Sequence, residues 1–126
     1  MPGRLGRMTI ATLSGVTLDC ADPATLAAFY TALTGWESVY TSDEYVYLAG
    51  TGPVKLGFQR IADHPRSSWP DDAKQFHLDF GVADLAKAEA LALELGATRP
   101  EFQPGDGGWI VLQDPAGHPF CLSPLA

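Results

Sequence analysis

The apolar residues of this chain recur with a period that changes along the sequence, and each change marks a boundary between secondary structures. Residues 76–82 alternate in polarity, and residues 85–95 then carry apolar side chains at helical spacing. Asp84 is suited to cap the predicted helix, because its carboxylate accepts hydrogen bonds from the free N–H groups of the first turn. Gly96 suits the left-handed residue that closes a helix. This stretch therefore predicts a strand, a capped helix and a glycine stop.

A weaker copy of this pattern lies in the first half of the chain. Residues 16–20 predict an apolar strand, Asp22 repeats the cap, and Pro23 fits the first position of a helix of residues 23–34 that ends at Gly35. The apolar stripe of this helix consists of Leu26, Phe29, Tyr30 and Leu33. The two capping aspartates are 62 residues apart, and the two closing glycines are 61 apart. The chain is therefore predicted to contain one supersecondary unit twice.

Each predicted helix is followed by three short segments with strand-like composition and turn signals between them. These segments are residues 37–40, 45–48 and 54–60 in the first half, and 98–103, 109–113 and 119–123 in the second half. Pro100 has no N–H group to donate, so the strand 98–103 is expected at an edge of its sheet. The pattern predicts an α+β fold that consists of two tandem βαβββ modules.

The predicted modules divide the chain into four parts. The parts are a flexible leader (residues 1–12), the first module (13–60), a polar linker (61–75) and the second module (76–126). Either Met1 or Met8 is expected to be the true start. A single module would bury too little surface to be stable by itself, so both modules are expected to share one domain.

The formal net charge of −7 argues against a nucleic-acid partner, because phosphate binding needs clustered Lys and Arg. No segment reaches the roughly 20 apolar residues of a membrane span. The two cysteines are too few for a disulfide framework, and no export signal is recognised, which predicts reduced thiols and a cytoplasmic location. The acidic charge is compatible with a cationic small molecule as the ligand.

Two motifs carry a resemblance to a known family. The helix start Ala21–Pro23 with Phe29 and Tyr30, and the closing run of residues 114–120 (DPAGHPF), resemble the vicinal oxygen chelate superfamily, in its glyoxalase, bleomycin-resistance and dioxygenase group. The resemblance covers about residues 13–124 and implies a glyoxalase-like fold, with curved mixed sheets around a cleft and a homodimer. It does not identify a reaction, since one fold serves many functions.

The resemblance also implies four positions for metal ligands. In this sequence the positions fall on Gly15, Gln59, His77 and Cys121. Gly15 has no side chain to offer, and Gln59 supplies a neutral amide, whereas Mg²⁺, Mn²⁺ and Fe²⁺ sites of this kind use His and carboxylate ligands. We therefore expect no native cofactor. If a divalent ion does bind, its ligands are expected to be His77, Gln59 and Cys121.

Strand parity predicts the residues that line the cleft of such a fold. The polar candidates for ligand contacts are Thr17, Lys55, Gln59, Asp79 and Cys121. The aromatic candidates are Tyr47, Trp69 and Trp109, on which a flat molecule can stack. Asp79 has an alternative interpretation as a solvated residue, and Cys121 as a small buried apolar residue.

Three functions stay open at this point. The first is a metal-free protein that binds or sequesters a small, cationic or aromatic molecule. The second is a metal-dependent lyase or isomerase of the glyoxalase type that uses His77. The third is a metal-free enzyme in which His77 acts with Asp79 or Cys121 as acid and base, so whether the protein is an enzyme is undecided.

Overall fold

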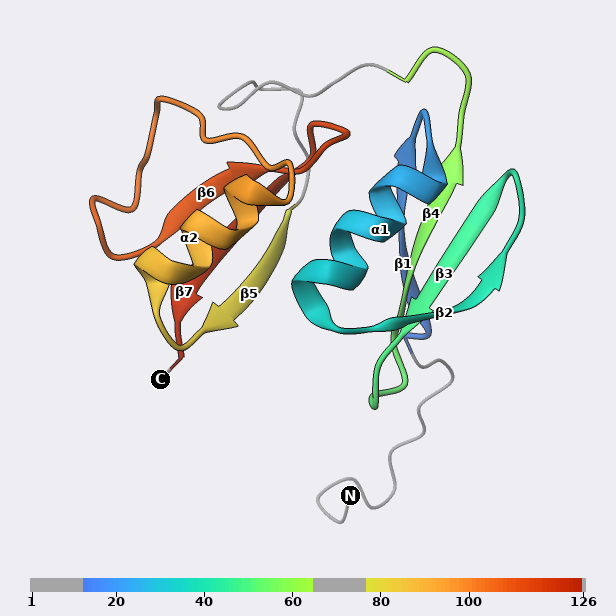
Figure 1. The fold of residues 1–126 in the computed structure, drawn as a ribbon, viewed down its shortest axis with the longest axis horizontal. Coiled ribbons are helices and arrows are strands. Elements are labelled where there is room, and N and C mark those ends of the chain that lie inside the picture. Colours follow the sequence, from blue (N-terminus) through green and yellow to red (C-terminus); the bar gives the residue numbers. More distant parts are fainter. Residues whose placement is uncertain (1–12, 65–76, 126) are drawn as a thin grey trace, which may run out of the picture.

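A computed structural model describes residues 13–64 and 77–125 of the chain, which form two modules of strands and one helix each (Figure 1). The first module contains β1 (Gly15–Cys20), α1 (Pro23–Thr34), β2 (Glu37–Thr41), β3 (Tyr45–Ala49) and β4 (Lys55–Arg60). The second module contains β5 (Leu78–Val82), α2 (Leu85–Glu94), β6 (Ile110–Gln113) and β7 (Pro119–Pro124). The predicted α+β class is confirmed.

The first module folds as its sequence pattern predicts. Its sheet has the strand order β1-β4-β3-β2, in which β1 runs parallel to β4 and the other neighbours are antiparallel. The Asp22 carboxylate accepts a hydrogen bond from the backbone N–H of Thr25 at 3.3 Å and so caps α1. Gly35 ends the helix with a φ of 78°, a conformation that glycine adopts without strain. Local signals therefore position α1 on its sheet.

The second module repeats this plan with one strand fewer. Its sheet has the order β5-β7-β6, with β5 parallel to β7, and the carboxylate of Asp84 caps α2 by accepting from the Lys87 N–H at 3.0 Å. The predicted strand 98–103 is wrong: the described part of that segment makes only an isolated bridge between Thr98 and Gln113. The sheets of the two modules therefore have four and three strands.

The side chain of Gln103 makes the hydrogen bonds to β6 that a fourth strand would otherwise make. The Gln103 amide donates to the Val111 carbonyl at 2.8 Å and accepts from the Val111 N–H at 2.9 Å. These are the two bonds that a paired backbone residue would make with β6. Because Pro100 cannot donate to a ladder, a side-chain amide satisfies the edge of β6 in place of a strand.

The helix α1 joins the two modules through its aromatic side chains. Tyr30 is fully buried and stacks on Phe58 of the first sheet with ring centroids 5.5 Å apart. On its other side it lies 6.3 Å from both Phe80 and Phe120 of the second sheet. Figure 1 shows α1 on the side of the first sheet that faces the second module. One hydrophobic core therefore serves both modules.

The turn between β6 and β7 is tied to α1 by a buried carboxylate. Asp114 is fully buried, and one of its oxygens accepts a hydrogen bond from the Tyr30 hydroxyl at 2.7 Å. The other accepts from the backbone N–H groups of Ala116 and His118, each at 2.9 Å. Nε2 of the His118 ring lies 2.6 Å from the backbone carbonyl oxygen of Asp19. The closing motif, residues 114–120, thus connects the second module to α1 and β1 of the first module.

Several predictions concern residues outside the described ranges. The leader 1–12 and most of the linker 61–75, with Trp69, fall there, so the module boundaries stay predictions. Within residues 13–64 and 77–125, neither helix is long and apolar enough to cross a membrane.

Candidate functional site

The face of the first sheet that points away from α1 carries the polar residues that the sequence predicts. The strand register places Thr17 of β1 beside Gly57 of β4, which in turn pairs with Tyr47 of β3. The next row on this face contains Gln59, and Lys55 lies at the other end of β4. Their alternation with the buried side chains follows from the two-residue period of a strand. The structure therefore brings Thr17, Gln59 and Tyr47 onto one face.

Tyrosines form a ladder across this face. Tyr45 and Tyr47 are stacked with ring centroids 5.9 Å apart and an interplanar angle of 9°. Tyr40 on β2 continues the row, with its ring centroid 6.1 Å from that of Tyr47. A side chain at Gly57 would not fit, because its Cβ would lie 2.6 Å from the Tyr47 ring. The glycine thus lets the tyrosine ring lie flat over β4.

The corresponding face of the second sheet carries an imidazole, a carboxylate and a thiol. Asp79 and Cys121 are directly opposite each other in the parallel β5–β7 ladder, and His77 precedes Asp79 by two residues. Nε2 of His77 lies 3.3 Å from an Asp79 carboxylate oxygen, and their side chains are 40% and 69% exposed. One donor atom from each of the three residues lies within 4.8 Å of the others. The sequence-predicted residues His77, Asp79 and Cys121 therefore form one cluster.

The thiol of this cluster is held in its neutral form at neutral pH. Cys121 is buried, and burial, together with the neighbouring Asp79 carboxylate, raises the pKa of its thiol to about 11. A neutral thiol is a poor nucleophile. The imidazole of His77 and the carboxylate of Asp79 are the exposed groups, so they are the ones that can exchange a proton or a hydrogen bond with a ligand.

The four metal-ligand positions implied by the resemblance do not fit a hard divalent ion. Gly15 has no side chain to supply a ligand atom, and a Cβ at this position would lie 3.3 Å from the carbonyl oxygen of Lys55. Gln59 lies on β4 of the other sheet, where Asp19 is its neighbour on β1. Among the described residues, the acidic, His and Cys side chains close enough to share an ion are those around Asp79, a residue outside the implied set. In the sequence, the spacing of two residues between His77 and Asp79 is the feature that indicates that the two side chains lie close together.

The predicted aromatic contacts have different environments. Tyr47 belongs to the tyrosine ladder. Trp109 is 37% exposed and precedes β6, and its ring packs against Gly105 so closely that a Cβ on that glycine would lie 2.7 Å from the indole. Trp69 lies outside the described residues. The aromatic surface of the first sheet is thus made of tyrosines, two of which (Tyr40 and Tyr45) were not among the predicted contacts.

The cavities formed by the chain lie mostly at the seam between the modules and beside the helices. One of about 130 Å³ is lined by Lys55 and Asp79, so it brings together one predicted residue from each module. One of about 270 Å³ lies between the start of α1 and the turn after β6, one of about 360 Å³ between α1 and the strands β2 and β3, and one of about 410 Å³ between the two helices, β5 and β7. None of these four is lined by Gln59, His77 or Cys121. Among the described residues, the exposed members of the candidate site are thus His77 and Asp79, whereas Cys121 is buried.

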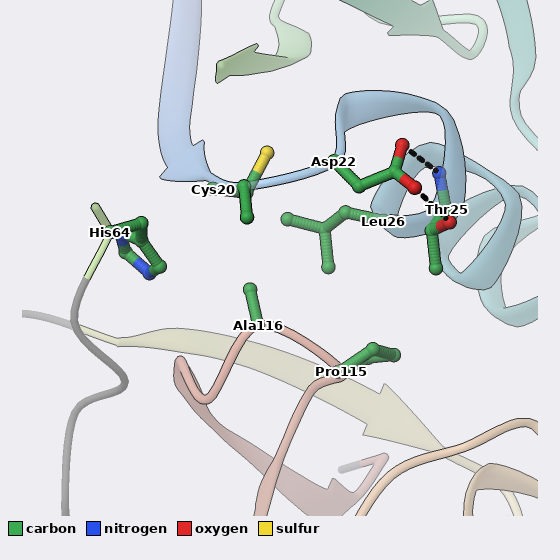
Figure 2. A pocket seen from close by; sticks show the side chains of 8 residues that line it. Cys20, Asp22, Thr25, Leu26, His64, Pro115 and Ala116 are labelled. Atoms are coloured by element: carbon green, nitrogen blue, oxygen red, sulfur yellow. Dashed lines mark hydrogen bonds between the residues drawn. The ribbon is translucent and has the colours of Figure 1, made fainter. Parts of the chain in front are cut away.

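Figure 2 shows the 270 Å³ cavity at the seam, where the polar groups are largely engaged in the fold. Both carboxylate oxygens of Asp22 accept hydrogen bonds from Thr25, one from its N–H at 3.3 Å and one from its hydroxyl at 2.7 Å. The Cys20 thiol donates to the Gln59 carbonyl at 3.6 Å, and burial raises its pKa to about 11. The ring nitrogens of His64 are buried without a hydrogen-bond partner. The remaining lining of this cavity is apolar, so among its described residues the His64 imidazole is the polar group that a ligand could still engage.

Comparison with known proteins identifies a family and solved structures to which this chain is similar. Residues 15–123 match the model of a family described as "Glyoxalase-like domain". No curated protein matches the chain by sequence. Among solved structures, an enzyme of the glyoxalase/bleomycin resistance protein/dioxygenase family from Burkholderia phytofirmans has a TM-score of 0.67 and 24% identity over 89% of this chain and 97% of that one.

Two structures with ligands are also similar in fold. The fosfomycin resistance protein FosX from Listeria monocytogenes, solved with Mn(II) and 1S,2S-dihydroxypropylphosphonic acid, has a TM-score of 0.72 at 18% identity, over 94% of this chain and 95% of that one. The bleomycin-binding protein from Streptomyces verticillus, solved with copper(II)-bleomycin, has a TM-score of 0.58 at 14% identity, over 94% and 100%. At these identities the similarity concerns the fold alone.

Proposed function

Because this chain belongs to the glyoxalase-like domain family, we propose that it binds a small, flat molecule with cationic or hydrogen-bonding groups on the open faces of its two sheets. The observation that carries the proposal is the tyrosine ladder beside Gly57. Stacked tyrosines with an exposed edge offer a large, rigid contact surface for an aromatic ligand. Binding of this kind does not depend on a catalytic ion.

Exposed acidic groups, Asp19 beside the ladder and Asp79 on the second sheet, support a cationic ligand. Asp19 and Asp79 are exposed carboxylates on the open faces, and the whole chain has a formal charge of −7. A cation over an aromatic ring gains about 0.5 to 2 kcal/mol, more when water is excluded. Thr17, Lys55 and Gln59 supply hydrogen-bonding groups that fix the orientation of the ligand on this surface.

We propose in addition that the protein acts as a homodimer in the cytoplasm. Thr17, Asp19 and Asp79 are exposed in the single chain, and Val39 and Tyr40 on the edge strand β2 are 56% and 54% exposed. A second copy placed over these faces would turn an open surface into a cleft and exclude water from it. Light scattering after size-exclusion chromatography measures the mass directly, and a monomer at all concentrations would contradict this part of the proposal.

The second candidate is an enzyme of the same fold, and the contact between His77 and Asp79 favours it. A carboxylate 3.3 Å from an imidazole orients the ring and supports a proton transfer. In a metal-dependent lyase or isomerase of the glyoxalase type, His77 would be an ion ligand, whereas in a metal-free enzyme it would be the base. The variant His77→Ala distinguishes the two enzyme hypotheses from the hypothesis of a protein that only binds. In either enzyme it would abolish turnover, whereas stacking of a ligand on the tyrosine ladder would stay unchanged.

The test of ligand binding uses two planar dyes of opposite charge. Proflavine, an aromatic cation, is titrated with the protein while its fluorescence is followed, and fluorescein serves as the matched anion. We expect proflavine to bind, Tyr47→Leu and Asp19→Asn to weaken it, and added salt to weaken it further. Asp43→Asn, which removes an exposed acid in the turn before β3, is the control and should bind as the wild type does.

Equal affinity for the two dyes would contradict the cationic preference. Proflavine binding that survives Tyr47→Leu unchanged would contradict the site. No binding of either dye to the wild-type protein would remove the support for an aromatic ligand altogether.

A further inference from the structure

We infer that His77, Asp79 and Cys121 form a binding site for a thiophilic divalent ion, Zn²⁺ before any other, within the second module alone. The site differs from the set implied by the family resemblance. Asp79 joins His77 and Cys121, and neither Gly15 nor Gln59 is required. The implied positions do not suit Mn²⁺ or Mg²⁺, whereas the cluster of His77, Asp79 and Cys121 offers donors for a softer ion.

The topology of the second sheet brings the three donors to one place. His77 directly precedes β5, and its Nε2 lies 3.3 Å from the carboxylate of Asp79 on that strand. The parallel ladder pairs Asp79 with Cys121 of β7. The three ligand atoms therefore converge because of strand register, and rigid strands hold ligands more accurately than loops do.

The distances are close to those that an ion requires. Tetrahedral Zn²⁺, with ligands about 2.0 to 2.3 Å away, keeps its donor atoms roughly 3.3 to 3.8 Å apart. Nε2 of His77 and the Asp79 carboxylate are already separated by 3.3 Å, and all three donors lie within 4.8 Å. The side chains of His77 and Asp79 are 40% and 69% exposed, so they are free to make the remaining adjustment.

The charges of the donors suit a divalent ion of soft character. When the ion binds, the Cys121 thiol releases its proton to solvent. The resulting thiolate and the Asp79 carboxylate neutralise two positive charges, and the imidazole ligand is neutral. Thiolate ligands select Zn²⁺ and Cu⁺, whereas Mg²⁺ and Mn²⁺ prefer oxygen and lie at the weak end of the divalent series. Three protein ligands leave one position open, which is the arrangement of zinc sites that accept an external ligand.

This inference does not rest on the proposed function. The tyrosine ladder lies on the first sheet, and the proposed binding of a flat cation requires no ion. The two ideas can therefore fail separately: a dye titration tests the first sheet, and a metal titration tests the second.

The experiment uses Co²⁺ as a spectroscopic substitute for Zn²⁺. Reduced protein freed of metal with EDTA is titrated with Co²⁺, and the near-ultraviolet band of charge transfer from thiolate to cobalt is followed. We expect the band in the wild-type protein, its displacement by stoichiometric Zn²⁺, and its persistence in excess Mn²⁺. Cys121→Ser should abolish it, and His77→Ala and Asp79→Asn should each weaken Co²⁺ binding by at least about tenfold.

Cys20→Ala is the matched control, because it removes the other buried thiol, which lies in the first module. It should keep the band, and circular dichroism confirms that each variant is folded. The inference is overturned if the wild-type protein gives no thiolate band, if Cys121→Ser gives the wild-type spectrum, or if the His77 and Asp79 variants bind Co²⁺ as tightly as the wild type.

Discussion

The hydrogen bond between Tyr30 and Asp114 gives the most direct prediction of stability. Both side chains are fully buried, and the hydroxyl lies 2.7 Å from the carboxylate. Tyr30→Phe removes the donor without changing the shape of the ring. Because both side chains are buried, water cannot reach Asp114 to replace the lost hydroxyl donor. Burial and the adjacent carboxylate raise the pKa of the Tyr30 hydroxyl, so it remains a donor at neutral pH.

The magnitude follows from the charge of the acceptor. A hydrogen bond to a charged group contributes about 1.5 to 3 kcal/mol, so Tyr30→Phe should lower the free energy of unfolding by about 2 kcal/mol. At roughly 3 °C per kcal/mol for a domain of this size, the midpoint of thermal unfolding should fall by about 6 °C. The remaining two bonds of Asp114, to the backbone of its own turn, should persist.

The assay is urea unfolding followed by tryptophan fluorescence and circular dichroism. Tyr40→Phe is the control, since Tyr40 is 54% exposed, and it should change stability by less than about 0.5 kcal/mol. A double-mutant cycle with Asp114→Asn isolates the pair, and a coupling energy of roughly 1 to 3 kcal/mol is expected. If Tyr30→Phe is as stable as the control, the argument that this bond joins the modules is refuted.

Three further predictions concern other parts of the fold. Gln103→Ala should destabilise the protein by about 1 to 3 kcal/mol in urea unfolding, because the Val111 N–H loses its acceptor, whereas a change within error would show that water replaces the amide. The raised pKa of Cys20 means that its thiol ionises near pH 9 when unfolded but only near pH 11 when folded, so stability should fall between these values, and less so in Cys20→Ala. An equal fall in both proteins would exclude Cys20 as a cause. Gly57→Ala should displace the ring of Tyr47 and reduce proflavine binding with the fold intact by circular dichroism, and unchanged binding would contradict the role of the ladder.

The candidate site was only partly predictable. Alternation along β1, β4 and β5 predicts which residues share a face, and Thr17, Gln59 and Asp79 do lie on the open faces of their sheets. It does not predict which side chains meet across strands, and so the contact of Tyr40 on β2 with Tyr47 on β3 was not predicted. The sequence pattern predicts Asp79 as a ligand contact, and the metal positions implied by the family resemblance do not include it.

The failed strand 98–103 has a different cause. Its composition resembles that of a strand, and Pro100 indicates an edge position. Whether an edge segment pairs depends on what else can satisfy its neighbour, and here the Gln103 side chain makes both bonds to Val111. Local propensity does not encode that competition.

The sequence by itself determined the two modules, their helices and the order of most strands, because caps, glycine stops and apolar periods act over a few neighbouring residues. Only the tertiary structure decided how the modules are joined and where reactive groups meet. Tyr30 and Asp114 are 84 residues apart, and Asp79 meets Cys121 only through the register of two parallel strands. Such contacts depend on the packing of a shared core and on ladder register, which no local pattern specifies.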